Sequence, residues 1–89
     1  MRAVITVLGK DKVGIIATIS KILADSNVNI LDISQTLMQD VFTMIMLTDI
    51  TDSSIAFNEL SDRLEAAGKD IGLYVKIQHE DIFNSMHRI

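Results

Sequence analysis

Two short runs of this sequence, Ala3 to Leu8 (AVITVL) and Val41 to Leu47 (VFTMIML), are apolar or β-branched at nearly every position. A strand of this composition is typically covered on both of its faces. Such strands lie in the middle of a sheet rather than at its edge. We therefore expect both runs to be central strands, in a sheet with neither face left to water.

Two longer segments have the apolar spacing of amphipathic helices. The first starts at Ile15 and ends at Ser26-Asn27, with its apolar side made by Ile15, Ile16, Ile19, Ile22 and Leu23. The second carries one apolar stripe before a stop at Gly72, made by Phe57, Leu60, Leu64, Ala67 and Ile71. The tail, from about residue 81 to 89, is also spaced as a helix. At roughly nine residues it is too short to persist alone, so it must dock on its own domain or on a partner.

Two further strands complete the pattern. Val28 to about Met38 is a long strand with a shift of apolar phase near Ile30 to Asp32, which indicates a β-bulge. Gln39-Asp40 then makes a hairpin turn. Leu73 to Gln78 alternates apolar and polar residues, which is typical of an edge strand.

The resulting order is βαββαβ. Two right-handed βαβ units in this order predict the ferredoxin-like α+β sandwich, a four-stranded antiparallel sheet with two helices on one face. In that topology the first and third strands are central, in agreement with their apolar composition. Residues 1–89 are predicted to form a single domain with a short C-terminal helix.

The composition narrows the classes of function. With 48% hydrophobic residues and a mean hydropathy of +0.32, so short a chain indicates a surface covered by another copy, hence a homodimer or higher homo-oligomer. Zero cysteines exclude thiolate metal sites and cysteine nucleophiles, and a net charge of −4 opposes binding to nucleic acid or anionic lipid. No apolar run is long enough for a membrane span and no signal peptide precedes the first strand, so a cytoplasmic location is expected.

The stretch from Gly9 to Gly14 is the candidate site, because it joins a strand to a helix N-terminus with unpaired N–H groups suited to an anion. A nucleotide-binding P-loop needs Lys and then Ser or Thr after its second glycine, whereas Ile15-Ile16 follow here. The chain has too few aromatic residues for an RNA-binding domain of this topology. It has no cysteine for a copper chaperone, and no arginine in this loop for an acylphosphatase. No nucleophile or acid/base pair is evident, so no enzyme is predicted.

The motifs Asp11-Lys12-Val13-Gly14-Ile15-Ile16 and Val28-Asn29-Ile30 resemble those of the ACT domain, the small-molecule-sensing module of amino-acid metabolism. The resemblance covers nearly the whole chain, which looks like the small free-standing ACT proteins of bacteria. Val13 stands where proline is common in that family, and Gly9 where some amino-acid-binding members carry a polar side chain.

The resemblance implies a regulatory module that binds an amino acid or related small molecule where two copies meet edge to edge. It places the ligand at Asp11, Val13, Gly14, Ile15 and Asn29. The N–H groups of Gly14 and Ile15 would bind the carboxylate, while Asp11 and Asn29 would bind the ammonium group. A regulated enzyme or a transcription factor would receive the signal. No cofactor and no metal are implied.

Other interpretations stay open. Gly14 could serve close packing of a helix on a strand, Asn29 could cap the turn before it, and Asp11 could be a solvated acid or a helix cap. A metal site from His79, Glu80, Asp81 and His87 is less favoured than helix-end charges, and Asp49 and Asp52 are interpreted as turn residues. The whole chain could instead be an interaction module without a ligand, or a small ferredoxin-like hydrolase.

Overall fold

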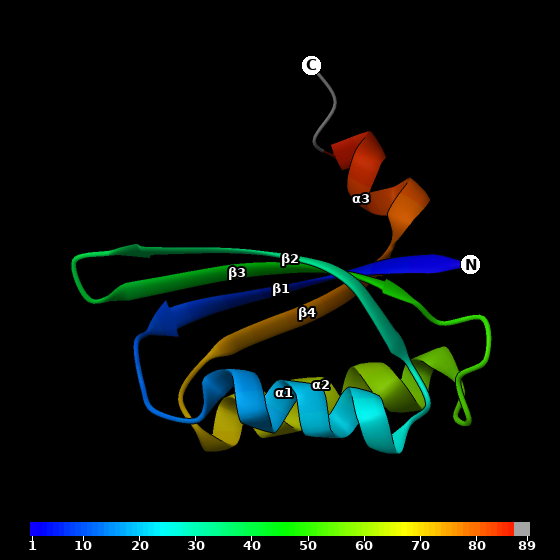
Figure 1. The fold of residues 1–89 in the computed structure, drawn as a ribbon, viewed down its shortest axis with the longest axis horizontal. Helices are drawn as coiled ribbons and strands as arrows, with labels where there is room; N and C mark the ends of the chain where they lie inside the picture. The colour runs from blue at the N-terminus through cyan, green and yellow to red at the C-terminus, as the bar shows by residue number, and fades with distance from the viewer. Residues whose placement is uncertain (87–89) are drawn as a thin grey trace.

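The computed structural model describes residues 1–86 and contains four strands and three helices in that range (Figure 1). Their order along the chain is β1 (Arg2–Lys10), α1 (Ile15–Asp25), β2 (Asn29–Met38), β3 (Val41–Asp49), α2 (Phe57–Asp70), β4 (Tyr74–His79) and α3 (Glu80–Met86). This is the ferredoxin-like βαββαβ order followed by a C-terminal helix, as the sequence predicts.

The strands form one antiparallel sheet in the order β2-β3-β1-β4. The predicted central strands are therefore β1 and β3, and β4 is an edge strand. The bulge in β2 is confirmed, since the register with β3 shifts between Ile30 and Asp32. Gln39 occupies the hairpin turn with φ +56°.

Helices α1 and α2 lie side by side on one face of the sheet (Figure 1). Alternate residues of the strands point to this face and form the core with the buried helix positions. The fully buried members include Ile5, Ile19, Leu23, Met44, Met46, Leu60 and Leu64. Buried Thr48 keeps its hydroxyl satisfied by donating to the carbonyl of Ala3 at 2.9 Å.

Several element boundaries differ from the predictions. Strand β3 ends at Asp49, two residues later than predicted, and β4 begins and ends one residue later. Strand β1 extends through Gly9 to Lys10, so Gly9 belongs to the sheet and not to the following loop. Strand β2 begins at Asn29, one residue later than predicted. The C-terminal helix begins at Glu80, and the predicted part of it from 87 to 89 lies outside the described residues.

The second face of the sheet is the one that α1 and α2 leave open. It carries Val4 and Leu8 from β1 and Ile45 from β3, because these residues alternate with core residues. Leu8 and Ile45 are 42% and 38% exposed. The second face is thus partly apolar, since Thr6, Thr43 and Lys76 lie on it as well. Within residues 1–86, α3 is the only helix on that side (Figure 1).

Candidate functional site

The loop between β1 and α1 is tied to the fold at two points. The N–H of Asp11 donates to the carbonyl of Asp40 in the β2–β3 turn at 2.9 Å. The ammonium group of Lys12 donates to the carbonyl of Ile71 at the C-terminal end of α2, at 2.7 Å. A cation is favourable there because carbonyl groups at a helix C-terminus carry partial negative charge. The loop is therefore anchored although its side chains are exposed.

Gly14 is the N-cap of α1 and has φ +89°, a conformation that favours glycine. Its carbonyl accepts the N–H of Thr18 at 2.9 Å, and no side chain caps the helix start. The first helical N–H groups have no intrahelical acceptor. A Cβ at Gly14 would meet nothing within 4 Å, so the space in front of this helix end is open. The alternative that Gly14 serves close helix–strand packing is wrong.

The other loop positions contribute in different ways. Asp11 and Val13 are exposed, whereas the side chain of Ile15 is 2% exposed and packs in the core. Ile15 can therefore offer a ligand only its backbone. Asp11 is not the helix cap, since Gly14 holds that position without a side-chain hydrogen bond.

Gly9 has a packing role instead of a place in the site. A Cβ on Gly9 would lie 2.5 Å from Cδ2 of Leu73 and 3.4 Å from its Cα. The glycine lets β1 pass close to the chain that enters β4. The sequence could not show this, because the contact joins positions far apart in the chain.

Asn29 is exposed at the start of β2 and lines an open cleft of about 390 Å³. The remaining lining residues are Ala24, Asn27, Val28, Asp49 and Asp52. A second hollow of about 520 Å³ continues along α1 past Ala17, Ser20 and Lys21. The turn before Asn29 is held by Asn27, whose amide donates to the carbonyl of Asp52 at 2.9 Å. The capping role considered for Asn29 thus belongs to Asn27.

Gly14 and Asn29 lie at opposite ends of α1. The helix has 11 residues, so its ends are roughly 16 Å apart at 1.5 Å per residue. A free amino acid is much shorter than this distance. Within one copy, the structure brings Asp11, Val13, Gly14 and Ile15 together but leaves Asn29 apart from them.

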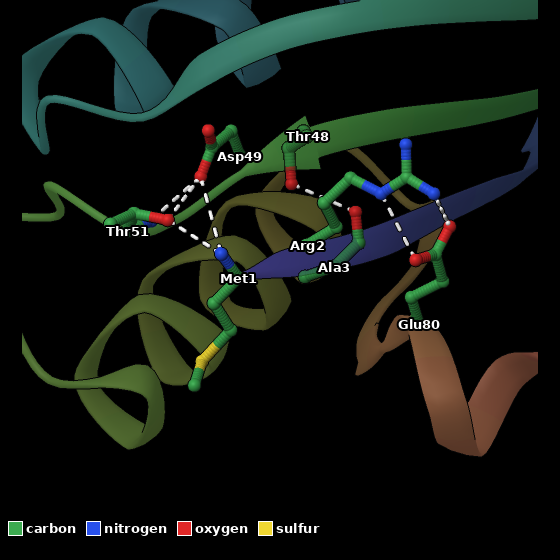
Figure 2. Close-up of polar contacts among 7 residues, drawn as sticks. All are labelled: Met1, Arg2, Ala3, Thr48, Asp49, Thr51 and Glu80. Carbon is green, nitrogen blue, oxygen red and sulfur yellow. Dashed lines mark hydrogen bonds and ion pairs between the residues drawn. The ribbon is translucent and has the colours of Figure 1, made fainter.

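Asp49 lines the Asn29 cleft, and its carboxylate makes polar contacts with Thr51 and Met1 (Figure 2). It pairs with Asn29 across the β2–β3 ladder. Its carboxylate accepts the hydroxyl of Thr51 at 2.6 Å and the N–H of Thr51 at 2.9 Å. The Met1 ammonium lies 3.8 Å away and donates to the Thr51 hydroxyl at 2.6 Å. The Thr51 hydroxyl is the largest of the causes that lower the pKa of Asp49.

This lowered pKa predicts an acid-dependent part of the stability. A carboxylate whose pKa is lower in the folded chain stabilises the fold above its ordinary pKa of about 3.9, and this contribution disappears as the pH falls through the lower folded value. We expect Asp49→Asn to give a free energy of unfolding that changes less with pH below about pH 4 than in the unmodified chain. Urea denaturation followed by circular dichroism at a series of pH values measures this.

Thr51→Val is the companion variant, because it removes the hydroxyl that bonds to Asp49. It should weaken the acid dependence in the same direction. An unchanged dependence in Asp49→Asn would contradict the role given to this carboxylate.

The described residues contain no group of three or more His, Cys, Asp or Glu placed to hold a metal ion. The metal interpretation of the tail also involved His87, which lies outside residues 1–86. Within the same range, no helix is long and apolar enough to cross a membrane.

The fold and the exposed, glycine-capped start of α1 are those of an ACT domain. The family model with this description matches residues 2–78, and the chain belongs to this family. Among its relatives, the UPF0237 protein of Clostridium acetobutylicum is 58% identical to this chain over 89 residues, and the match covers 100% of both chains. That of Methanocaldococcus jannaschii is 54% identical over 88 residues, 99% of this chain and 98% of the relative.

Solved structures agree with this assignment. An ACT domain protein from Streptococcus pneumoniae superposes with a TM-score of 0.80 at 41% identity, with 93% of each chain covered. The ligand-free regulatory subunit of aspartate kinase from Thermus thermophilus has a TM-score of 0.65 at 22% identity, over 86% of this chain and 50% of that one. The second likeness shows a shared fold alone.

Proposed function

We propose that this protein is a homo-oligomeric sensor that binds an amino acid or a related zwitterion and passes its bound state to another protein. The observation that carries the proposal is the open start of α1. Gly14 places no side chain there, nothing lies within 4 Å of where a Cβ would be, and no side chain caps the helix. A carboxylate bound to these N–H groups would be stabilised by hydrogen bonds and by the helix dipole.

The second part of the site comes from another copy. Because Gly14 and Asn29 lie at opposite ends of α1, a two-fold axis beside β2 would bring Gly14 of one copy close to Asn29 of its partner. Strand β2 supports this arrangement, since it is an edge strand of ten residues and every residue from Leu31 to Met38 is exposed. Exposed edges of this length are normally covered in native proteins.

The two ends of α1 suit the two charges of a zwitterion. The helix start offers N–H donors to a carboxylate, and Asp11 lies in the same loop. The other end offers the Asn29 amide and, in the same cleft, the carboxylates of Asp49 and Asp52. These oxygens can accept the hydrogen bonds that an ammonium group donates. With few atoms to bind, the affinity should fall in the micromolar to millimolar range of a metabolite sensor.

Titration calorimetry with a panel of amino acids tests the proposal. We expect heat from at least one amino acid, and at least about tenfold weaker binding of its analogues that lack the amino or the carboxylate group, because each loses a charge-assisted hydrogen bond. A panel without any response would overturn the sensing function. The chain would then be an interaction module, a function that its exposed edge strand also fits.

A further inference from the structure

A hollow of about 200 Å³ lies on the second face of the sheet, between the strands and helix α3. Its lining residues are Tyr74, Lys76 and Gln78 of β4, Thr6 of β1 and Met86 of α3. The three β4 residues are alternate positions of one strand and therefore point to the same face. Thr6 is the register partner of Lys76, and the Cβ atoms of such partners lie about 5 Å apart. Three elements of the fold thus build one small space.

Helix α3 forms one wall of this hollow because it is held to the sheet at both of its ends. Arg2 donates to Glu80, the first residue of α3, through two nitrogens at 3.0 and 2.6 Å (Figure 2). The side-chain amide of Gln78 donates to Sδ of Met86, the last residue of α3, at 3.1 Å. The helix has seven residues and none of them is buried, so its stability depends on such contacts.

The hollow collects donors that the fold itself does not use. Within residues 1–86, the ammonium group of Lys76 forms no ion pair, whereas Arg2 on the same face is paired with Glu80. The hydroxyl groups of Thr6 and Tyr74 have no hydrogen-bond partner in that range either. None of the described residues that line the hollow is acidic. A positive charge and two hydroxyl groups therefore line one space without a counter-charge, an arrangement that a bound anion would complete.

We propose that this hollow binds a small organic carboxylate that has no amino group. Lys76 holds the carboxylate by a charge-assisted hydrogen bond, and the hydroxyl groups of Thr6 and Tyr74 donate to its oxygens. The ring of Tyr74 and the side chain of Met86 offer apolar surface to a short carbon chain. A zwitterionic amino acid is disfavoured, because its ammonium group would find no acidic partner beside Lys76.

The size of the hollow limits the ligand to a few atoms. A space of about 200 Å³ has roughly the volume that six or seven water molecules occupy in the liquid. A carboxylate of about four to six heavy atoms fits this space, and so small a ligand binds at about millimolar concentration. Because Met86 lines the hollow, the bound carboxylate also adds contacts to α3 and stabilises its docking on the sheet.

An NMR titration with butyrate, a carboxylate of about six heavy atoms, tests the site. We expect saturable shifts of the amide signals of Thr6 and Lys76 at about millimolar butyrate. Lys76→Met should weaken this binding at least about tenfold, because it removes the charged donor. Lys10→Met is the matched control, since Lys10 is exposed on the same face of β1, four positions from Thr6 and outside the hollow. The absence of saturable shifts, or equal weakening in the two variants, would overturn the proposal.

Two further probes distinguish an organic carboxylate from charge alone. Butylammonium has the same carbon chain with the opposite charge and should not bind. Inorganic phosphate has the charge without the chain and should bind at least about tenfold more weakly than butyrate, because it makes no apolar contact with Tyr74 or Met86. Phosphate that binds as tightly as butyrate would contradict the proposed class of ligand.

Hydrogen exchange provides a second measurement, because Met86 belongs to the site. Saturating butyrate should slow the exchange of the α3 amides in the unmodified chain, and should have no effect in Lys76→Met. Gly14→Val should respond as the unmodified chain does, since α1 lies on the other face of the sheet (Figure 1). The result is therefore independent of the amino-acid site under "Proposed function". Exchange that saturating butyrate leaves unchanged would contradict a ligand beneath α3.

Discussion

Gly68→Val is expected to lower the free energy of unfolding by about 3 kcal/mol or more, at the upper end of the cost of overpacking a core. Gly68 is buried on α2 where the helix contacts β4. A Cβ at this position would lie 2.6 Å from Cγ2 of Val75 and 2.9 Å from the carbonyl oxygen of Leu73. The side chain of Val75 could rotate away, but the carbonyl group of Leu73 can move only if the backbone moves.

The backbone at this point is held by the end of α2 itself. The N–H of Leu73 donates to the carbonyl of Gly68 at 2.7 Å, and the N–H of Gly72 donates to that of Lys69 at 3.2 Å. With Gly72 at φ +72°, these two bonds form a Schellman motif. Any shift that made room for a side chain at Gly68 would break it.

Urea denaturation followed by circular dichroism measures the effect, with Gly68→Ala as the milder variant. Alanine raises helix propensity by about 1 kcal/mol over glycine, so a loss of stability here would isolate the steric cost. Gly14→Ala is the control, because its strain at positive φ costs about 1 to 2 kcal/mol without any clash. A Gly68→Ala chain as stable as the unmodified one would contradict this role of Gly68.

The second large effect concerns the proposed ligand site and uses two variants that are each defective. Gly14→Val fills the open helix start of one copy, and Asn29→Ala removes the amide proposed to come from its partner. Each should lower the affinity for the amino acid by about 10- to 100-fold, since a hydrogen bond to a charged group contributes about 1.5 to 3 kcal/mol. Ser34→Ala, exposed on the same strand as Asn29, should bind normally.

Mixing the two variants distinguishes a site between copies from a site within one copy. In a mixed dimer, Gly14 of the Asn29→Ala chain faces Asn29 of the Gly14→Val chain, so one of the two sites has both residues intact. After dissociation and reassembly in equal amounts, about a quarter of all sites should bind with the original affinity. Calorimetry of the mixture measures this fraction. No recovery, with both variants folded and dimeric, would show that the site is not shared between copies.

Much of the fold could be predicted because it depends on short-range patterns. The phase shift in β2 indicated the bulge, and Gly72 marked the end of α2, since both signals lie within a few residues of the feature that they produce. The central position of β1 and β3 followed from their composition. The sequence places Gly9 in the loop, because no local pattern shows that it lies against Leu73, which is distant in the chain.

The candidate site also has one part that local sequence signals predict and one part that depends on distant residues. The glycine at the start of α1 was evident from the motif, and its φ of +89° and open surroundings agree with a backbone role. The cleft at Asn29 was not evident in full. The sequence indicates only turn residues at Asp49 and Asp52, and the pairing of β2 with β3 brings Asp49 beside Asn29.

The sequence by itself determined the order of helices and strands, the central strands and the glycine that opens α1, because hydrophobic period and backbone preference act locally. The tertiary structure alone decided that Gly14 and Asn29 lie at opposite ends of α1 and that Gly68 allows α2 to approach β4. These features depend on distances between segments that are remote in the chain. Such distances are set by packing and strand register, which no local pattern encodes.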